Sequence, residues 1–505
     1  SWLVAAAEAN GRTEEYAAII GGHYELAGEL VEAAGWYGRA GKQAAAQFDP
    51  EAAEEWLGRA LALTPEGEWA ARYELLMARE GVYHLGGERE KQAADLAMLV
   101  ELTGVTGKTT QAPPSRAAEV LIRQAAYAGA VSDYSAAATA ASEAVTRAEA
   151  IGDGTLASAA LARWGDALWR QGEYAGARER YLTGWARAEA ADAPAELADN
   201  LKGLGNVAYE QGAYARAREH YEAALGIYRE IGDRQGESAC LGNLGLVAAD
   251  QGDYAGARKH HEASLGIARE IGYLRAESIR LNNLGVAARD QGDYVRAREY
   301  HEAALAINRQ IGYRRGESIC LVNLGVVARN QADYVGAQEY YGAALAIARE
   351  VGYRSGEGLV LHDLGALARV EGDLVGAEAY FRQALVLHEE LGQPQHVVED
   401  QAGLAGVVLE RGELAAARQA LSPVLAYLAA NPTLDGAMHP YRVPLICGQV
   451  LLALRELTLA REIVGAACRA WATLAEKLPT PAERERFRQI PEYAALRRLR
   501  IKLEE

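Results

Sequence analysis

The chain has 505 residues, a formal net charge of −17, and only three Phe and three Met among the hydrophobic residues that make up 50% of it. Its length exceeds that of a typical single-core domain, so it must form several domains or a repeat array. The negative charge argues against a nucleic-acid binder, whose phosphate contacts need clustered Lys and Arg. No apolar run approaches the roughly 18 residues that a membrane helix requires.

The first 123 residues are predicted to be an irregular helical segment, 1–123. Ser1-Trp2 already resembles the interior of a helix, so we expect the chain to be a piece of a longer protein. Residues 14–63 contain the series H-Y-x-x-A-G, A-A-x-W-Y-x-x-A-G and W-L-x-R-A-L-x-L. This series resembles the segment after the nucleotide-binding core in bacterial signal-transducing ATPases of the STAND type, and in multidomain adenylate cyclases. The resemblance implies a nucleotide-binding module and an effector before Ser1.

A possible phosphate-binding loop, G-V-T-G-K-T-T, begins at Gly104. Such a loop needs a glycine five residues before Gly107, where this chain has Leu102. It also follows a buried strand, whereas residues 89–102 have the apolar spacing of an amphipathic helix. We therefore predict a linker between helices here, and no nucleotide binding by this chain.

Between about 124 and 430 the sequence repeats every forty residues, in eight units. The columns that carry the repeat include Leu204, Leu244, Leu284, Leu324, Leu364 and Leu404; Gly205, Gly245, Gly285, Gly325 and Gly365; Tyr214, Tyr254, Tyr294 and Tyr334; and Ala217, Ala257, Ala297, Ala337, Ala377 and Ala417.

Each repeat is predicted to be a pair of helices. Around Leu244, the segment 237–250 has apolar residues at helical spacing. In the turn that follows, Gly252 can end this helix and Asp253 can cap the next one, which runs over 254–271. Small residues at Gly245 and Ala257 would let the two backbones approach closely.

The pattern L-G-x(6)-G-x-Y-x-x-A-x(3)-[YH]-x-x-[AS]-L resembles the tetratricopeptide repeat in its forty-residue form, as in the spindle adaptor LGN and kinesin light chain. The resemblance covers about 300 residues. It implies an all-α fold, a right-handed superhelix of antiparallel helix pairs (an α-solenoid) whose first helices line a concave groove.

The histidines and cysteines of the array are predicted to be structural. His261 and His301 share a column with Tyr221 and Tyr341, which is typical of a helix-packing position and does not require a metal. The four cysteines form no C-x-x-C pair, and small buried thiols suit a reducing, cytoplasmic setting. We expect no cofactor and, since no catalytic constellation is present, no enzymatic activity.

A partner is expected on the face of each first helix that lies opposite the Leu column. This face repeats three kinds of residue: an amide or acid column of Asn243, Asn283, Asn323 and Asp363; the apolar residues Val286 and Val326; and a basic stripe of Arg289, Arg329 and Arg369. A ladder of amides can hold an extended peptide backbone, and arginines favour a partner with carboxylates. In the resembling repeats, groove asparagines contact the bound peptide. The alternative is that the asparagines bond neighbouring helices and the apolar residues pack between them.

Residues 431–505 lie outside the period and are predicted to form about three closing helices. Two functions fit the whole chain. The first is the sensor region of a STAND-type ATPase, with a protein or peptide inducer in the groove. The second is a free-standing adaptor that bridges proteins. A small-molecule ligand inside the superhelix stays an open alternative.

Overall fold

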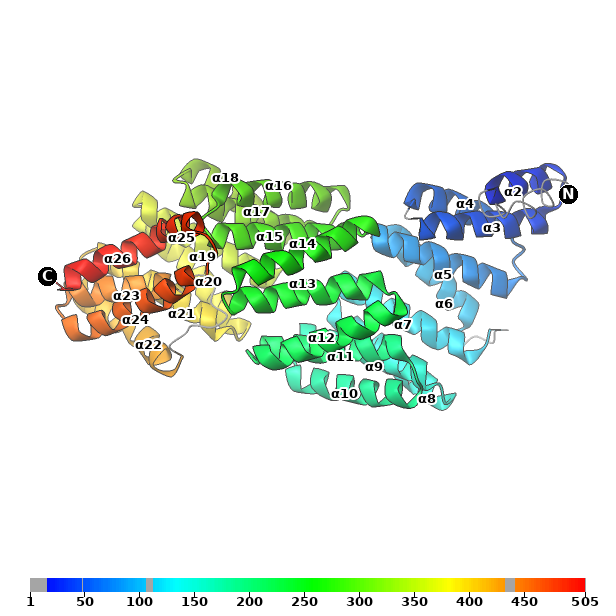
Figure 1. The fold of residues 1–505 in the computed structure, drawn as a ribbon, viewed down its shortest axis with the longest axis horizontal. Helices are drawn as coiled ribbons and strands as arrows, with labels where there is room; N and C mark the ends of the chain where they lie inside the picture. The colour runs from blue at the N-terminus through cyan, green and yellow to red at the C-terminus, as the bar shows by residue number, and fades with distance from the viewer. Residues whose placement is uncertain (1–15, 48, 106–111, 432–440, 505) are drawn as a thin grey trace. The chain divides into compact units, whose positions relative to one another are not determined.

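The structure is a computed structural model that describes residues 16–47, 49–105, 112–431 and 441–504. Within these ranges the chain forms 25 α-helices and no strand (Figure 1). The prediction of an all-α chain of antiparallel helix pairs is confirmed.

Five helices precede the regular repeats. They are α2 (Ala17–Leu26), α3 (Leu30–Ala46), α4 (Pro50–Leu63), α5 (Trp69–Gly86) and α6 (Arg89–Thr103). Helix α3 packs against α4, and α5 against α6. The segment before the glycine-rich loop is therefore a helix, as predicted, and Gly104 ends it with a φ of 67°. Residues 106–111 of that loop lie outside the described residues.

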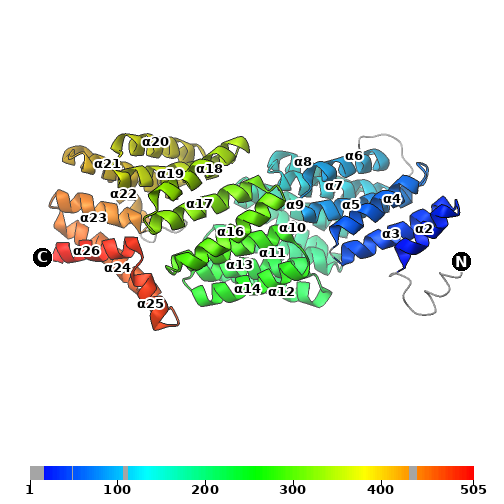
Figure 2. The same cartoon turned by 90° about the horizontal axis from the view of Figure 1, so that it is seen from above.

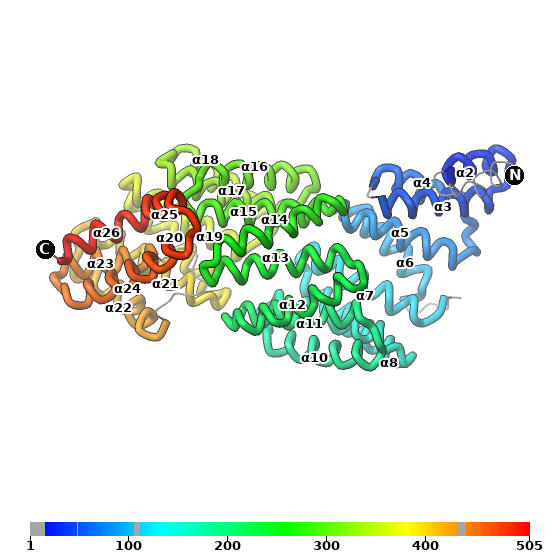
Figure 3. The backbone as a smooth tube through the Cα atoms, viewed as in Figure 1, coloured from blue at the N-terminus to red at the C-terminus, as the bar shows by residue number. Residues whose placement is uncertain are grey.

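The forty-residue period forms eight helix pairs, which can be followed from α7 to α22 along the trace in Figure 3. Their bounds are α7 (Pro114–Ala130), α8 (Tyr134–Ala150), α9 (Gly154–Arg170), α10 (Tyr174–Ala190), α11 (Pro194–Glu210), α12 (Tyr214–Ile231), α13 (Arg234–Asp250), α14 (Tyr254–Glu270), α15 (Leu274–Asp290), α16 (Tyr294–Gln310), α17 (Arg314–Asn330), α18 (Tyr334–Glu350), α19 (Arg354–Glu371), α20 (Leu374–Glu390), α21 (Pro394–Glu410) and α22 (Leu414–Ala430).

The turns inside the helix pairs contain the predicted helix-ending glycine and helix-capping aspartate. Gly252 has a φ of 72°, a conformation that L side chains rarely adopt. The Asp253 carboxylate accepts a hydrogen bond from the backbone N–H of Gly256 over 2.9 Å, which caps α14.

The glycine column of the first helices has a more specific role than close backbone approach. A Cβ at Gly205 would lie 2.5 Å from the Tyr221 ring, and a Cβ at Gly325 would lie 2.5 Å from the Tyr341 ring. The same holds for Gly285 against His301. An aromatic or imidazole ring of the second helix therefore lies on the bare backbone of the first helix in each of these pairs.

Four helices follow the repeats: α23 (Arg442–Ala453), α24 (Leu457–Glu476), α25 (Pro481–Arg488) and α26 (Pro491–Glu504). They are the orange and red helices of Figure 2. Trp471 of α24 stacks on Tyr493 of α26 with ring centroids 5.0 Å apart, and Phe487 of α25 lies 5.5 Å from the same indole. These aromatic contacts join the last three helices.

Contacts divide the chain into two compact parts. We call them the N-terminal body, which runs up to Val247 and includes Ala263–Glu277, and the C-terminal body, which comprises Ala248–Glu262 and Ser278–Glu505. Each body is described below by itself.

Candidate functional site: the inner face of the first helices

The first helices of successive pairs contact one another directly. Such contacts join α7 to α9 and α9 to α11 in the N-terminal body, and α17 to α19 and α19 to α21 in the C-terminal body. We call the side of these helices that faces away from the second helices the inner face. This is the face on which the sequence predicts the partner-binding residues.

The nine candidate residues differ in their exposure. Val326, Arg329 and Asp363 are buried, with 3%, 8% and 0% of their surface exposed. The other six are partly exposed: Asn243, Asn283, Val286, Arg289, Asn323 and Arg369. Asn243 belongs to the N-terminal body, and the other eight belong to the C-terminal body.

Two of the three asparagines bond to the neighbouring first helix. Asn243 donates from Nδ2 to Oδ1 of Asn206 over 3.1 Å, and Asn323 donates from Nδ2 to Oδ1 of Asn282 over 3.0 Å. Arg289 donates to Oδ1 of Asn323 over 3.2 Å, so an arginine of one repeat also contacts an amide of the next. The Asn283 side chain forms no hydrogen bond within the described ranges. The amide column therefore includes bracing members and one uncommitted member.

Arg329 and Asp363 form a buried ion pair with each other, and side chains of two helices that follow the repeats extend this pair. Arg329 donates to Oδ1 of Asp363 over 2.7 Å, and Arg442 of α23 lies 3.5 Å from the same oxygen. The carboxylate of Glu492 of α26 lies 3.3 Å from the second terminal guanidinium nitrogen of Arg442. Burial opposes the charge of Arg329, yet Tyr341 and Asp363 keep its pKa above the ordinary value. Helices α23 and α26 thus occupy part of the inner face of the C-terminal body.

The closing helices also contact the turns of two repeats. Lys477 at the end of α24 donates to the carbonyl oxygen of Gln251 over 2.7 Å, and Leu474 lies directly against the Cα of Gly252. In the next repeat, a Cβ at Gly292 would lie 2.9 Å from the carbonyl oxygen of Arg486. The C-terminal helices are therefore anchored at the turns before α14 and α16.

A group of charged residues on the inner face of the N-terminal body was not among the predicted site residues. Arg163 lies 3.2 Å from Asp166 and 3.6 Å from Asp199, whose carboxylate also accepts bonds from Lys202 and Tyr228. Burial opposes ionisation of Asp199, but Lys202 and Arg163 hold its pKa well below the usual range. Arg163 occupies the repeat position of Asn243, so extending that column backward would have revealed the group.

The histidines of the repeat column lie in buried surroundings, which indicates a packing role. His261 and His301 are buried, and burial lowers the pKa of each to about 3, so both are neutral at pH 7. Nδ1 of His301 lies 3.1 Å from Oδ1 of Asn282. None of the four cysteines is in a disulfide, and all four are buried. In the part of the chain that the structure describes, no group of three or more His, Cys, Asp and Glu is arranged to hold a metal ion.

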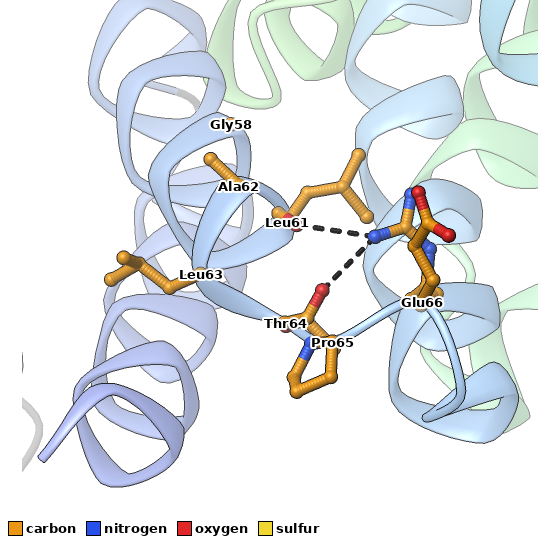
Figure 4. Close-up of a pocket in the computed structure, with 8 residues that line it drawn as sticks. Gly58, Leu61, Ala62, Leu63, Thr64, Pro65 and Glu66 are labelled. Atoms are coloured by element: carbon orange, nitrogen blue, oxygen red, sulfur yellow. Dashed lines mark hydrogen bonds between the residues drawn. The ribbon is translucent and has the colours of Figure 1, made fainter.

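A hollow of 510 Å³ lies beside the end of α4 (Figure 4). Its arginine, Arg72, donates to the carbonyl oxygens of Leu61 and Thr64 over 3.4 and 3.1 Å. These are carbonyls that the end of a helix leaves without partners. The hollow is therefore explained by the capping of α4, and we assign it no ligand.

Among the described residues, no helix is both long enough and apolar enough to cross a membrane.

Comparison with known proteins supports the repeat assignment. Residues 196–270 and 277–350 match the tetratricopeptide repeat family. No curated protein sequence matches the chain at a significant level.

Three solved structures are among those that match this chain at low sequence identity. The apo form of the quorum sensor NprR from B. thuringiensis is 13% identical, with a TM-score of 0.50 over 70% of this chain and 97% of that one. A Rap protein complexed with Competence and Sporulation Factor is 16% identical, with a TM-score of 0.47 over 69% and 99%. BtubC from P. vanneervenii is 23% identical, with a TM-score of 0.35 over 46% and 92%. The family match thus covers residues 196–270 and 277–350, and the helix pairs continue on both sides of it.

Proposed function

We propose that this chain is the ligand-sensing region of a STAND-type regulatory ATPase, and that it binds a protein or peptide inducer on the inner face of its first helices. The chain itself carries no catalysis in this proposal, and the inducer is met in the cytoplasm of a bacterium. The STAND assignment depends on the sequence series in residues 14–63. Binding on the inner face depends on the geometry of the C-terminal body.

The observation that carries the binding proposal is the polar row formed by Asn282, Asn283, Asn323 and Arg289. Each amide offers two donor hydrogens and one acceptor oxygen, so Asn323 keeps a second donor hydrogen after it bonds Asn282. The Asn283 side chain forms no hydrogen bond among the described residues and is partly exposed. An extended peptide backbone presents the matching N–H and C=O groups.

Arg289 gives this row its charge preference. Its side chain is 15% exposed and contacts Asp290 over 2.8 Å as well as Asn323. Burial opposes its charge, but Asp290 keeps its pKa above the ordinary value, so the guanidinium stays charged. Arg369 is 20% exposed and lies 3.3 Å from Glu410. We propose that these arginines favour a peptide with carboxylates, and that Val286 contacts an apolar side chain of it.

The similar NprR structure belongs to a protein described as a quorum sensor. At 13% identity this likeness shows the fold alone, so the ligand class proposed here depends on the inner face.

The test compares two asparagines of the same column. A random peptide library is screened against the whole chain, and the selected peptide is titrated into variants. Asn283→Ala should weaken binding without changing the melting temperature, because this side chain has no hydrogen bond to lose within the described part of the chain. Asn323→Ala should weaken binding and also lower stability by about 0.5–1.5 kcal/mol, because it loses its bond to Asn282.

Asn431→Ala is the control, since among the described residues that side chain bonds only the carbonyl oxygen of Tyr427, at the exposed end of α22. If Asn283→Ala bound the peptide with unchanged affinity, the proposal that the peptide binds on the inner face would be wrong. A library that yields no peptide while a metabolite screen yields a ligand would favour the small-molecule alternative. The alternative function, a free-standing adaptor that bridges proteins, would be favoured if the gene's full reading frame encoded no nucleotide-binding module.

A further inference from the structure

In the C-terminal body, the turns inside the helix pairs are covered in two repeats and open in the next two. Gly252, in the turn before α14, is buried, and Gln291, in the turn before α16, is only 6% exposed. Gln331 and Glu371 occupy the position of Gln291 in the next two repeats, and both are exposed. The turns of successive repeats therefore form one edge of this body, of which only the first part is covered.

The covered part of the edge shows which side chains these turns accept from a helix. Leu474 of α24 lies directly against the Cα of Gly252, and Lys477, three residues later, donates to the carbonyl oxygen of the preceding turn residue over 2.7 Å. At the next turn, Arg486 of α25 lies 4.0 Å from the carboxylate of Asp293, which caps α16. A helix docked here thus supplies an aliphatic side chain and a positive charge.

The open part of the edge carries exposed valines. Val335 and Val375, the second residues of α18 and α20, are 71% and 76% exposed, and Val295 of α16 is 65% exposed. Alanine is the better helix former, and a solvated valine gains nothing from packing, so helix stability does not explain these valines. The other five repeats have a small residue at this position: Ser135, Ala175, Ala215, Ala255 and Ala415.

The open turns also carry carboxylates that are available to a cation. Asp333 and Asp373 cap α18 and α20, and each accepts one backbone N–H bond, over 3.0 and 2.9 Å. Both aspartates are exposed, and neither carboxylate forms an ion pair with a residue that the structure describes. Each open turn therefore combines an exposed aliphatic side chain with a negative charge two residues before it.

We propose that these two turns dock an amphipathic helix of a partner protein, on a surface made of Val335, Val375 and the two capping aspartates. We call this surface the open turn edge. The partner helix carries an aliphatic residue and, three residues later, a lysine or arginine, as α24 does with Leu474 and Lys477. The open turn edge continues a surface on which the protein already docks helices, and its charge is complementary to such a partner. Since α24 is already docked on its own repeats, the occupant is a helix of a different protein. None of the residues proposed to bind a peptide on the inner face takes part.

The experiment selects helical peptides from a displayed library for binding to the whole chain, with counter-selection against a Val335→Ala/Val375→Ala double variant. Peptides that survive should carry an aliphatic residue and a Lys or Arg three residues later. In titrations, the double variant should bind a surviving peptide at least tenfold more weakly, because each substitution removes two carbon atoms from the contact. It should melt at or above the wild-type temperature, since alanine occupies this position in four other repeats.

Asp333→Asn tests the charge without removing the helix cap, because asparagine caps as well as aspartate. It should weaken the selected peptide severalfold, and added salt should weaken wild-type binding toward the same level. Val351→Ala is the matched control, because Val351 is 41% exposed at the opposite end of α18. It should bind the peptide like wild type. Asn283→Ala, on the inner face, should also bind it like wild type, which separates this surface from the peptide site proposed above.

Several results would overturn the proposal. It is wrong if no peptide survives counter-selection, if the survivors lack the cation, or if Asp333→Asn binds them as tightly as wild type. A loss of affinity in Asn283→Ala equal to that of the double variant would place the peptides on the inner face instead. A lower melting temperature of the double variant would mean that the valines support the fold. In sedimentation equilibrium, a wild-type dimer that the double variant fails to form would make the occupant a second copy of this chain and not a partner protein.

Discussion

Arg329 of α17 donates a hydrogen bond to Asp363 of α19 over 2.7 Å, and their side chains are only 7% and 0% exposed. The two residues stand on the inner face of neighbouring repeats, where a partner was expected. In this structure they hold each other, and Arg442 approaches the same carboxylate oxygen from α23. A ligand that contacts them would first have to displace α23 and α26.

Asp363→Ala should destabilise the protein strongly. The substitution leaves the guanidinium groups of Arg329 and Arg442 buried without the carboxylate between them. Removing one partner of a buried ion pair costs about 3–5 kcal/mol. Urea unfolding, followed by circular dichroism, measures the loss.

The control for Asp363→Ala is Glu357→Ala. Glu357 pairs with Arg349 over the same 2.7 Å, but Arg349 is 51% exposed. An exposed pair contributes about 0–1 kcal/mol, so this variant should unfold almost like wild type. If both variants lost the same free energy of unfolding, the Asp363 pair would contribute no more than an exposed ion pair.

Gly325→Ala should also be destabilising, because its new methyl group would lie 2.5 Å from the Tyr341 ring. Such overpacking costs about 1–3 kcal/mol. Gly342→Ala, in α18, is the matched variant, because a Cβ there meets nothing within 4 Å. It should gain about 0.5–1 kcal/mol from the better helix propensity of alanine. Thermal unfolding of both variants tests the sign, and a stabilised Gly325→Ala would contradict the ring-on-backbone packing.

Stability should depend on pH through His362. Its Nδ1 lies 2.7 Å from Oδ1 of buried Asp400, which also contacts His388. Burial opposes the charged imidazole, but Asp400, with Glu399 and Asp363 nearby, raises the pKa of His362 above its ordinary value of 6.5. The stabilisation is therefore complete below pH 6.5 and is lost as the pH rises through the raised pKa.

Urea unfolding between about pH 6 and 9 measures this dependence. Wild-type protein should lose stability across the range, and His362→Gln should lose less. Parallel pH profiles for the two proteins would show that His362 does not titrate in this way.

The repeating part of the fold could be predicted from sequence because its contacts recur. Gly252 and Asp253 end and begin helices wherever their columns appear, so local residues and a forty-residue period were enough. The column shared by His301 and Tyr341 likewise indicated packing, and both rings are buried. Whether the asparagine column binds a ligand remains a prediction.

The rest could not be predicted because it involves contacts that do not repeat. Lys477 and Gln251 are 226 residues apart, and nothing in either segment indicates the other. The carboxylate of Asp363 is similarly shared with a helix outside the repeats, so its column position alone suggested an open surface.

The contact between α24 and the repeats can be tested with two glycines in equivalent turns. Gly252 and Gly212 both have positive φ, 72° and 69°, so alanine costs about 1–2 kcal/mol at either position. They differ in their neighbours, because Leu474 lies directly against Gly252 whereas nothing lies within 4 Å of a Cβ at Gly212. Gly252→Ala should therefore lose about 1–3 kcal/mol more than Gly212→Ala in urea unfolding. It should also make residues 457–504 more sensitive to limited proteolysis, because the displaced side chain is part of α24. Equal losses and equal cleavage in the two variants would mean that α24 is not docked on this turn in solution.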